Sequence, residues 1–104
     1  KKKKFTNYKL IKGSVEKTLD LFLKKNKKIK ISFLHLDLDV YKPTFFALER
    51  LYEKVSKGGV ILLDDYGKVH GATEATKDFF KKENIRLNIQ STKFDKKLKF
   101  IIKK

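Results

Sequence analysis

The sequence has no cysteine, no tryptophan and a single proline in its 104 residues. Without cysteine, the chain can form neither a disulfide framework nor a thiolate zinc site. No apolar run approaches the roughly 20 residues that a membrane-spanning helix needs, and the lysine-rich start lacks the apolar core of a signal peptide. A cytoplasmic protein with no membrane span is therefore the default expectation.

Acidic residues are also scarce. The sequence has 12 aspartates and glutamates against 27 lysines and arginines, which gives a net charge of +15. Such an excess attracts polyanions over long distances. However, only Arg50 and Arg86 are arginines, and arginine usually makes the bidentate contacts to bases and phosphates. The lysines are spread along every segment. We therefore expect a solvated lysine surface and no specific nucleic-acid partner, with a lysine-rich nucleic-acid-binding module as an alternative.

Alternating strand and helix patterns predict one α/β domain over residues 1–104. Residues 29–38 are expected to form a strand buried on both faces, because its apolar residues are too closely spaced for a half-exposed strand: Ile31, Phe33, Leu34, Leu36 and Leu38. Residues 60–63 are apolar throughout and are expected to form a second buried strand. Between them, apolar residues recur at helical spacing from Phe45 to Val55. A strand, a helix and a strand in this order normally form a right-handed unit with parallel strands.

Weaker patterns flank this central unit. Tyr8–Ile11 is a candidate short strand, Ser14 a candidate N-cap of a following helix, and residues 71–82 a further helix. Apolar and polar residues alternate over Ile85–Gln90, and Leu98–Ile102 is mostly apolar. Both segments are predicted to be strands that pair as an antiparallel hairpin. The predicted sheet is therefore mostly parallel, with one antiparallel strand near its C-terminal end.

Two acidic pairs follow the two central strands: Asp37 with Asp39, and Asp64 with Asp65. Ligands of parallel α/β sheets bind outside the carboxyl ends of the strands, so these four carboxylates are expected to meet. Carboxylate oxygens suit a hard divalent cation such as Mg²⁺. We predict Asp37, Asp64 and Asp65 as metal ligands and Asp39 as a base that accepts a proton. The alternative is that these aspartates cap the following helices.

Other side chains near the acidic pairs are candidates for substrate contact. Tyr41 and Tyr66 flank the acids and are expected to line the pocket, although packing explains them equally well. His70 follows in the next loop and is placed for substrate contact, with a surface role as the alternative. His35 is expected on the strand face opposite the metal ligands, as a packed and hydrogen-bonded histidine.

Five segments carry a resemblance to a known family: His35–Thr44, Leu48–Tyr52, Lys57–Gly59, Leu62–Tyr66 and Gly71–Ala75. They resemble the macrocin O-methyltransferases, which are class I S-adenosylmethionine-dependent sugar O-methyltransferases. The resemblance implies a partial Rossmann-like class I methyltransferase fold, the cofactors S-adenosylmethionine and Mg²⁺, and a sugar or glycoside acceptor.

The resemblance also implies roles for individual residues. Asp37, Asp64 and Asp65 resemble the metal ligands of the family, and Asp39 resembles an acid near the acceptor hydroxyl. Gly13 and Ser14 fall where related enzymes approach the adenine of the cofactor. A homo-oligomer is left open.

One departure from the family limits what the chain is expected to do. The first two strands of the family, with their glycine-rich cofactor loop and ribose-binding acid, have no counterpart between Lys1 and Gly13. The chain therefore resembles the C-terminal part of a methyltransferase domain. Alone, it is expected to be inactive and to bind S-adenosylmethionine weakly or not at all.

Two further alternatives remain open. In haloacid dehalogenase-like phosphatases an Asp-x-Asp motif also follows an apolar strand, as Asp37 and Asp39 do here. However, that fold has its second acidic pair much later in the chain. A gene product without any activity is the other alternative.

Overall fold

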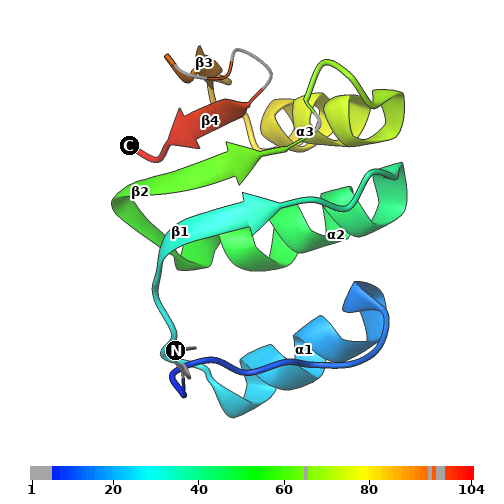
Figure 1. Cartoon of the computed structure of the whole chain (residues 1–104), viewed down its shortest axis with the longest axis vertical. Coiled ribbons are helices and arrows are strands. Elements are labelled where there is room, and N and C mark those ends of the chain that lie inside the picture. The colour runs from blue at the N-terminus through cyan, green and yellow to red at the C-terminus, as the bar shows by residue number, and fades with distance from the viewer. Residues whose placement is uncertain (1–5, 65, 94, 96–97) are drawn as a thin grey trace, which may run out of the picture.

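The computed structural model describes residues 6–64, 66–93, 95 and 98–104. Strands and helices alternate along the chain (Figure 1), which confirms the predicted α/β class. The elements are, in order, α1 (Val15–Lys25), β1 (Ile31–Leu36), α2 (Tyr41–Leu51), the 3₁₀ turn η1 (Tyr52–Lys54), β2 (Val55–Leu63), α3 (His70–Lys82), β3 (Gln90–Ser91) and β4 (Lys99–Ile102).

The strands form one mixed sheet in the order β1-β2-β4-β3. β1 and β2 are parallel, whereas β4 is antiparallel to both of its neighbours, β2 and β3. Three strands therefore run in one direction and β4 runs in the other. This confirms the mostly parallel sheet with one antiparallel strand near the C-terminal end, and it confirms the antiparallel pairing of the last two strands.

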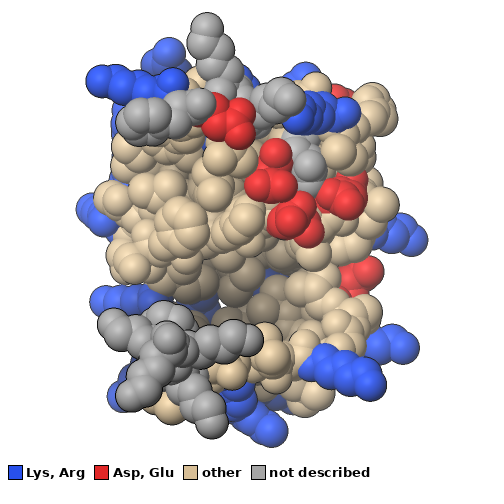
Figure 2. Space-filling view, in the orientation of Figure 1, with Lys and Arg blue, Asp and Glu red and all other residues tan. Residues whose placement is uncertain are grey.

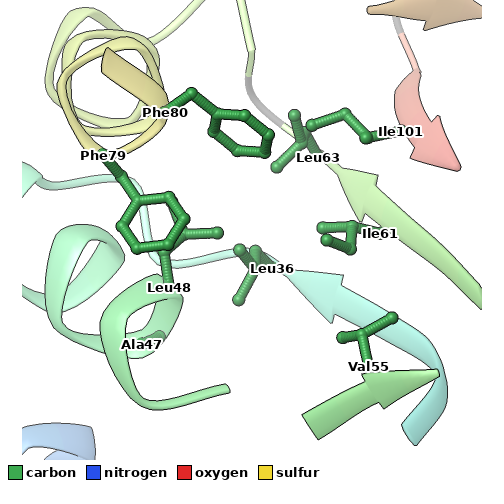
Figure 3. Packing of buried hydrophobic residues seen from close by; sticks show 9 residues of the cluster. All are labelled: Leu36, Ala47, Leu48, Val55, Ile61, Leu63, Phe79, Phe80 and Ile101. Atoms are coloured by element: carbon green, nitrogen blue, oxygen red, sulfur yellow. The ribbon is translucent and has the colours of Figure 1, made fainter. Parts of the chain in front are cut away.

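Of the described helices, α2 and α3 lie on one side of the sheet, and α1 lies beyond the edge strand β1, against α2 (Figure 1). α2 packs between α1 and α3, and α2 and α3 cover the strands. The core lies between these helices and the sheet, where Leu48 and Ile61 are completely buried. Figure 3 shows how side chains from both layers converge there: Leu36, Ala47, Leu48, Val55, Ile61, Leu63, Phe79, Phe80 and Ile101.

No described helix covers the other face of the sheet, which Figure 2 shows as a broad area without charged side chains. Strand register places Phe33, Val60 and Ile102 on this face. Phe33 is 59% exposed and Ile102 is 41% exposed. The prediction that the strand over residues 29–38 is buried on both faces is therefore wrong, because the described helices cover only one face of β1.

The segment Tyr8–Ile11 is not a strand, contrary to the prediction. It pairs with no described strand, and its Leu10 side chain is 87% exposed. β3 is shorter and later than predicted, since only Gln90–Ser91 forms a ladder with β4. Among the described helices, none combines the length and the apolar character that crossing a membrane would require.

Candidate metal site

The loops that follow β1 and β2 meet at one edge of the sheet. Because β1 and β2 are parallel, their carboxyl ends lie side by side, and the backbone N–H of Asp64 donates a 3.1 Å hydrogen bond to the carbonyl of Leu36. Figure 2 shows acidic side chains gathered over the tips of these two strands, on a molecule whose other charges in this view are mostly basic.

His35, Asp37 and Asp64 form a cluster at this edge. One ligand atom from each side chain lies within 4.8 Å of the ligand atoms of the other two. The Nε2 atom of His35 lies 3.3 Å from Oδ1 of Asp64. The side chains of His35 and Asp64 are 43% and 34% exposed, so the cluster is open to solvent. An imidazole and two carboxylates in this arrangement could hold a divalent cation and leave positions free for another ligand.

His35 belongs to this cluster, so the prediction that it packs on the face opposite the metal ligands is wrong. Side chains of a strand alternate between faces, so residues 35 and 37 lie on the same side. His35 pairs with Leu62 of β2, and Asp64 lies two positions beyond Leu62. All three cluster members therefore project on the uncovered side of the sheet. The two-residue spacing between His35 and Asp37 was the signal that could have identified this position.

Asp39 lies outside the cluster. It occupies the centre of a tight turn in which the N–H of Val40 donates a 2.6 Å hydrogen bond to the carbonyl of Leu38. Its φ of 59° is left-handed, a conformation that aspartate tolerates better than most residues. Side chains two residues apart in a regular strand point to the same side, but this turn interrupts the strand geometry between Asp37 and Asp39. The strand pattern therefore does not place the Asp39 side chain beside that of Asp37. Asp65, the other predicted acid, lies outside the described residues.

The start of α3 rests directly against this turn. A Cβ atom at Gly71 would lie 2.9 Å from the backbone nitrogen of Tyr41 and 3.3 Å from the carbonyl oxygen of Asp39. Such a contact with backbone atoms leaves no room for a larger side chain. Gly71 therefore allows the loop after β1 and the first turn of α3 to lie in contact.

The three predicted substrate-contact residues lie in different settings. The hydroxyl group of Tyr41 donates a hydrogen bond to Asp78, which raises the pKa of the phenol, with desolvation and nearby negative charge adding to the effect. Tyr66 lines a cavity of about 10 Å³ together with Asp64, about the space that one water molecule needs. His70 is the exposed first residue of α3.

Gly13 and Ser14 form the turn that leads into α1. Gly13 has a φ of 126°, and a Cβ atom there would lie 2.8 Å from Cγ2 of Thr18. Ser14 is the N-cap, but its hydroxyl group makes no capping hydrogen bond. Figure 1 shows this turn at the same end of the molecule as the carboxyl ends of β1 and β2.

The model of a protein family described as macrocin-O-methyltransferase (TylF) matches residues 2–99. No curated protein matches the sequence significantly.

Solved structures of methyltransferases are similar in fold. The apo structure of CalS11, described as a TDP-rhamnose 3′-O-methyltransferase in calicheamicin biosynthesis, superimposes with a TM-score of 0.77 at 22% identity, over 88% of this chain and 40% of that chain. A crystal structure described as CalS11, calicheamicin methyltransferase, gives a TM-score of 0.78 at 21% identity, over 88% and 36%. The O-methyltransferase NovP gives 0.64 at 28% identity, over 71% and 30%. The chain therefore spans less than half the length of each of these proteins.

Proposed function

This chain belongs to the macrocin O-methyltransferase (TylF) family, and from this premise we propose that it forms the metal- and acceptor-binding part of an S-adenosylmethionine-dependent sugar O-methyltransferase. The observation that carries the proposal is the cluster of His35, Asp37 and Asp64 at the carboxyl ends of two parallel strands. Enzymes with such sheets bind their ligands at this edge. The acceptor class follows the description of CalS11 as a methyltransferase that acts on a TDP-sugar.

The residues present fit a divalent cation. Asp37 and Asp64 offer carboxylate oxygens at one solvent-open position, and such oxygens suit Mg²⁺, which binds through one or two carboxylates and keeps several waters. Asp65 follows Asp64 directly in the sequence and is the third proposed ligand. A cation bound there would act as a Lewis acid and lower the pKa of an acceptor hydroxyl group.

The remaining roles fall to side chains around the cluster. Asp39, exposed on its turn, accepts the proton of the acceptor hydroxyl as a general base. Bound S-adenosylmethionine would supply the methyl group to the acceptor oxygen, with S-adenosylhomocysteine as the second product. Tyr41, Tyr66 and His70 would contact the acceptor, and Gly13 and Ser14 would contact the adenine of the cofactor.

The chain spans 40% or less of the length of the methyltransferases to which it is similar. We therefore expect no methyl transfer by the isolated chain and no binding of S-adenosylmethionine tighter than about millimolar, an affinity of roughly 4 kcal/mol. Calorimetric titration with the cofactor measures this directly. A micromolar dissociation constant would show that this part of the proposal is wrong.

The metal site is tested by titrating the chain with Mg²⁺ and following the amide signals of residues 35–39 and 64 by NMR. Asp37→Asn and Asp64→Asn should each weaken Mg²⁺ binding by about 10-fold or more, because each removes a charged oxygen ligand. Glu83→Gln removes the same charge from an exposed position at the end of α3 and should leave the affinity unchanged. Equal affinities for all four proteins would contradict the proposed site.

A further inference from the structure

We propose that His35 is a direct metal ligand, and that it makes this site prefer a first-row transition-metal ion over Mg²⁺. The proposal rests on the metal site of the proposed function and extends it to a nitrogen donor. It concerns a residue that the family resemblance did not include among the ligands.

The distances in the cluster fit three ligands around one ion. Bonds from a metal ion to imidazole nitrogen or carboxylate oxygen are about 2.0–2.2 Å long, so two ligand atoms at right angles lie about 3 Å apart. His35 Nε2 and Asp64 Oδ1 are 3.3 Å apart. Asp37 also offers a ligand atom, and one ligand atom from each of the three side chains lies within 4.8 Å of the other two. Rotation of the exposed side chains would bring all three ligand atoms to bonding distance of one ion.

The donor types determine which ion this arrangement favours. Imidazole nitrogen suits zinc, copper, iron and nickel, whereas carboxylate and water oxygens suit magnesium, calcium and manganese. A site with one imidazole therefore gains affinity for cobalt or nickel that it does not gain for Mg²⁺. The chain has no cysteine and only one other histidine, His70. Few nitrogen or sulfur donors compete with His35 for such an ion.

His35 could act on the site in a second way, by donating a hydrogen bond from Nε2 to Asp64 and orienting that carboxylate. The two roles make different predictions. A positioning histidine affects every ion that Asp64 binds, including Mg²⁺. A ligating histidine affects transition-metal ions selectively and leaves Mg²⁺ binding almost unchanged.

The experiment titrates the full chain separately with Co²⁺ and Mg²⁺ by calorimetry. The wild-type chain should bind Co²⁺ at least about 10-fold more tightly than Mg²⁺. His35→Gln should weaken Co²⁺ binding by about 10-fold or more and change Mg²⁺ binding by less than about twofold. The matched control is His70→Gln, which removes the only other imidazole and should change neither affinity. Because His35 is exposed, its replacement should leave the fold intact, which circular dichroism verifies.

Spectroscopy gives a second readout that a hydrogen-bonding role would not produce. Pulsed electron paramagnetic resonance of bound Mn²⁺ should show coupling to an imidazole nitrogen in the wild-type chain and in His70→Gln, and none in His35→Gln.

Each other outcome overturns the inference in a distinct way. Equal weakening of Co²⁺ and Mg²⁺ binding in His35→Gln would identify a positioning residue. Unchanged binding of both ions would show that His35 has no role while the proposed Mg²⁺ site stands. A wild-type chain that binds neither ion would remove the proposed metal site together with this inference.

Discussion

The hydroxyl group of Tyr41 donates a 2.6 Å hydrogen bond to Oδ2 of Asp78. Tyr41 begins α2 immediately after the turn that contains Asp39, and Asp78 lies in α3. The ring of Tyr41 also stacks on Phe45 at a centroid distance of 5.8 Å. The bond therefore joins the two helices that follow the site strands, and it fixes the beginning of α2 beside the metal cluster.

Asp78→Asn should lower the pKa of the Tyr41 phenol, because the hydrogen bond to Asp78 is the largest cause of its upward shift from 10.0. A group whose pKa is raised by folding contributes stability that is present below its unfolded pKa and is lost as the pH rises through the folded pKa. The wild-type chain should therefore lose part of its stability above pH 10, and Tyr41→Phe should lose less. NMR titration of ¹³C-labelled tyrosine measures the shift, and an unchanged Tyr41 titration in Asp78→Asn would refute it.

Gly71→Ala should destabilise the chain, although alanine normally favours a helix by about 1 kcal/mol over glycine. The added methyl group would lie 2.9 Å from the backbone nitrogen of Tyr41, so α3 or the turn must move. Such overpacking typically costs about 1–3 kcal/mol. Urea unfolding measures the change. Lys77→Ala, on an exposed position of the same helix, is the control, and equal stability of both variants would show that the contact is easily relieved.

Leu48→Ala should lower the free energy of unfolding by about 2–5 kcal/mol, because Leu48 is completely buried between α2, α3 and the sheet. Leu21→Ala removes the same atoms from a side chain that is 60% exposed on α1. This control should change stability by less than about 0.5 kcal/mol. Urea unfolding measures both changes. If Leu48→Ala and Leu21→Ala lower the free energy of unfolding by similar amounts, the assignment of Leu48 to the core is wrong.

Arg50→Gln should weaken the attachment of α1 to α2 only slightly. The Nε atom of Arg50 donates a 2.8 Å hydrogen bond to Asp20 of α1, and the guanidinium group lies 4.3 Å from the centre of the Phe46 ring. Both partners of the ion pair are substantially exposed, so the loss should be at most about 1 kcal/mol and smaller at high salt. A loss that is large and independent of salt would show that stacking on Phe46 dominates.

The sequence predicted the central elements of the fold because apolar spacing reports directly which residues pack. The helix with Leu48 and the strand with Ile61 were identifiable for this reason. The apolar character of a strand does not show whether another layer packs on each of its faces, so the exposure of Phe33 could not be predicted. Tyr8–Ile11 has a strand-like pattern, but it forms no strand because no neighbouring strand pairs with it.

The site was partly predictable for a topological reason. Parallel strands end at the same edge, and this brings Asp37 and Asp64 together. The position of Asp39 could not be read in the same way, because strand alternation stops at a tight turn that only the backbone conformation reveals. The predicted position of His35 was wrong, although the sequence shows that His35 and Asp37 are two residues apart and so lie on the same face of a strand.

No described helix covers one face of the sheet, and on this face Phe33 and Ile102 are exposed beside Val60. Exposed apolar faces of this kind bind hydrophobic dyes and promote association between molecules. The high positive charge opposes such association by repulsion, and added salt screens that repulsion. In solution, the behaviour of the purified chain should therefore depend on ionic strength, with aggregation favoured when its lysines are screened.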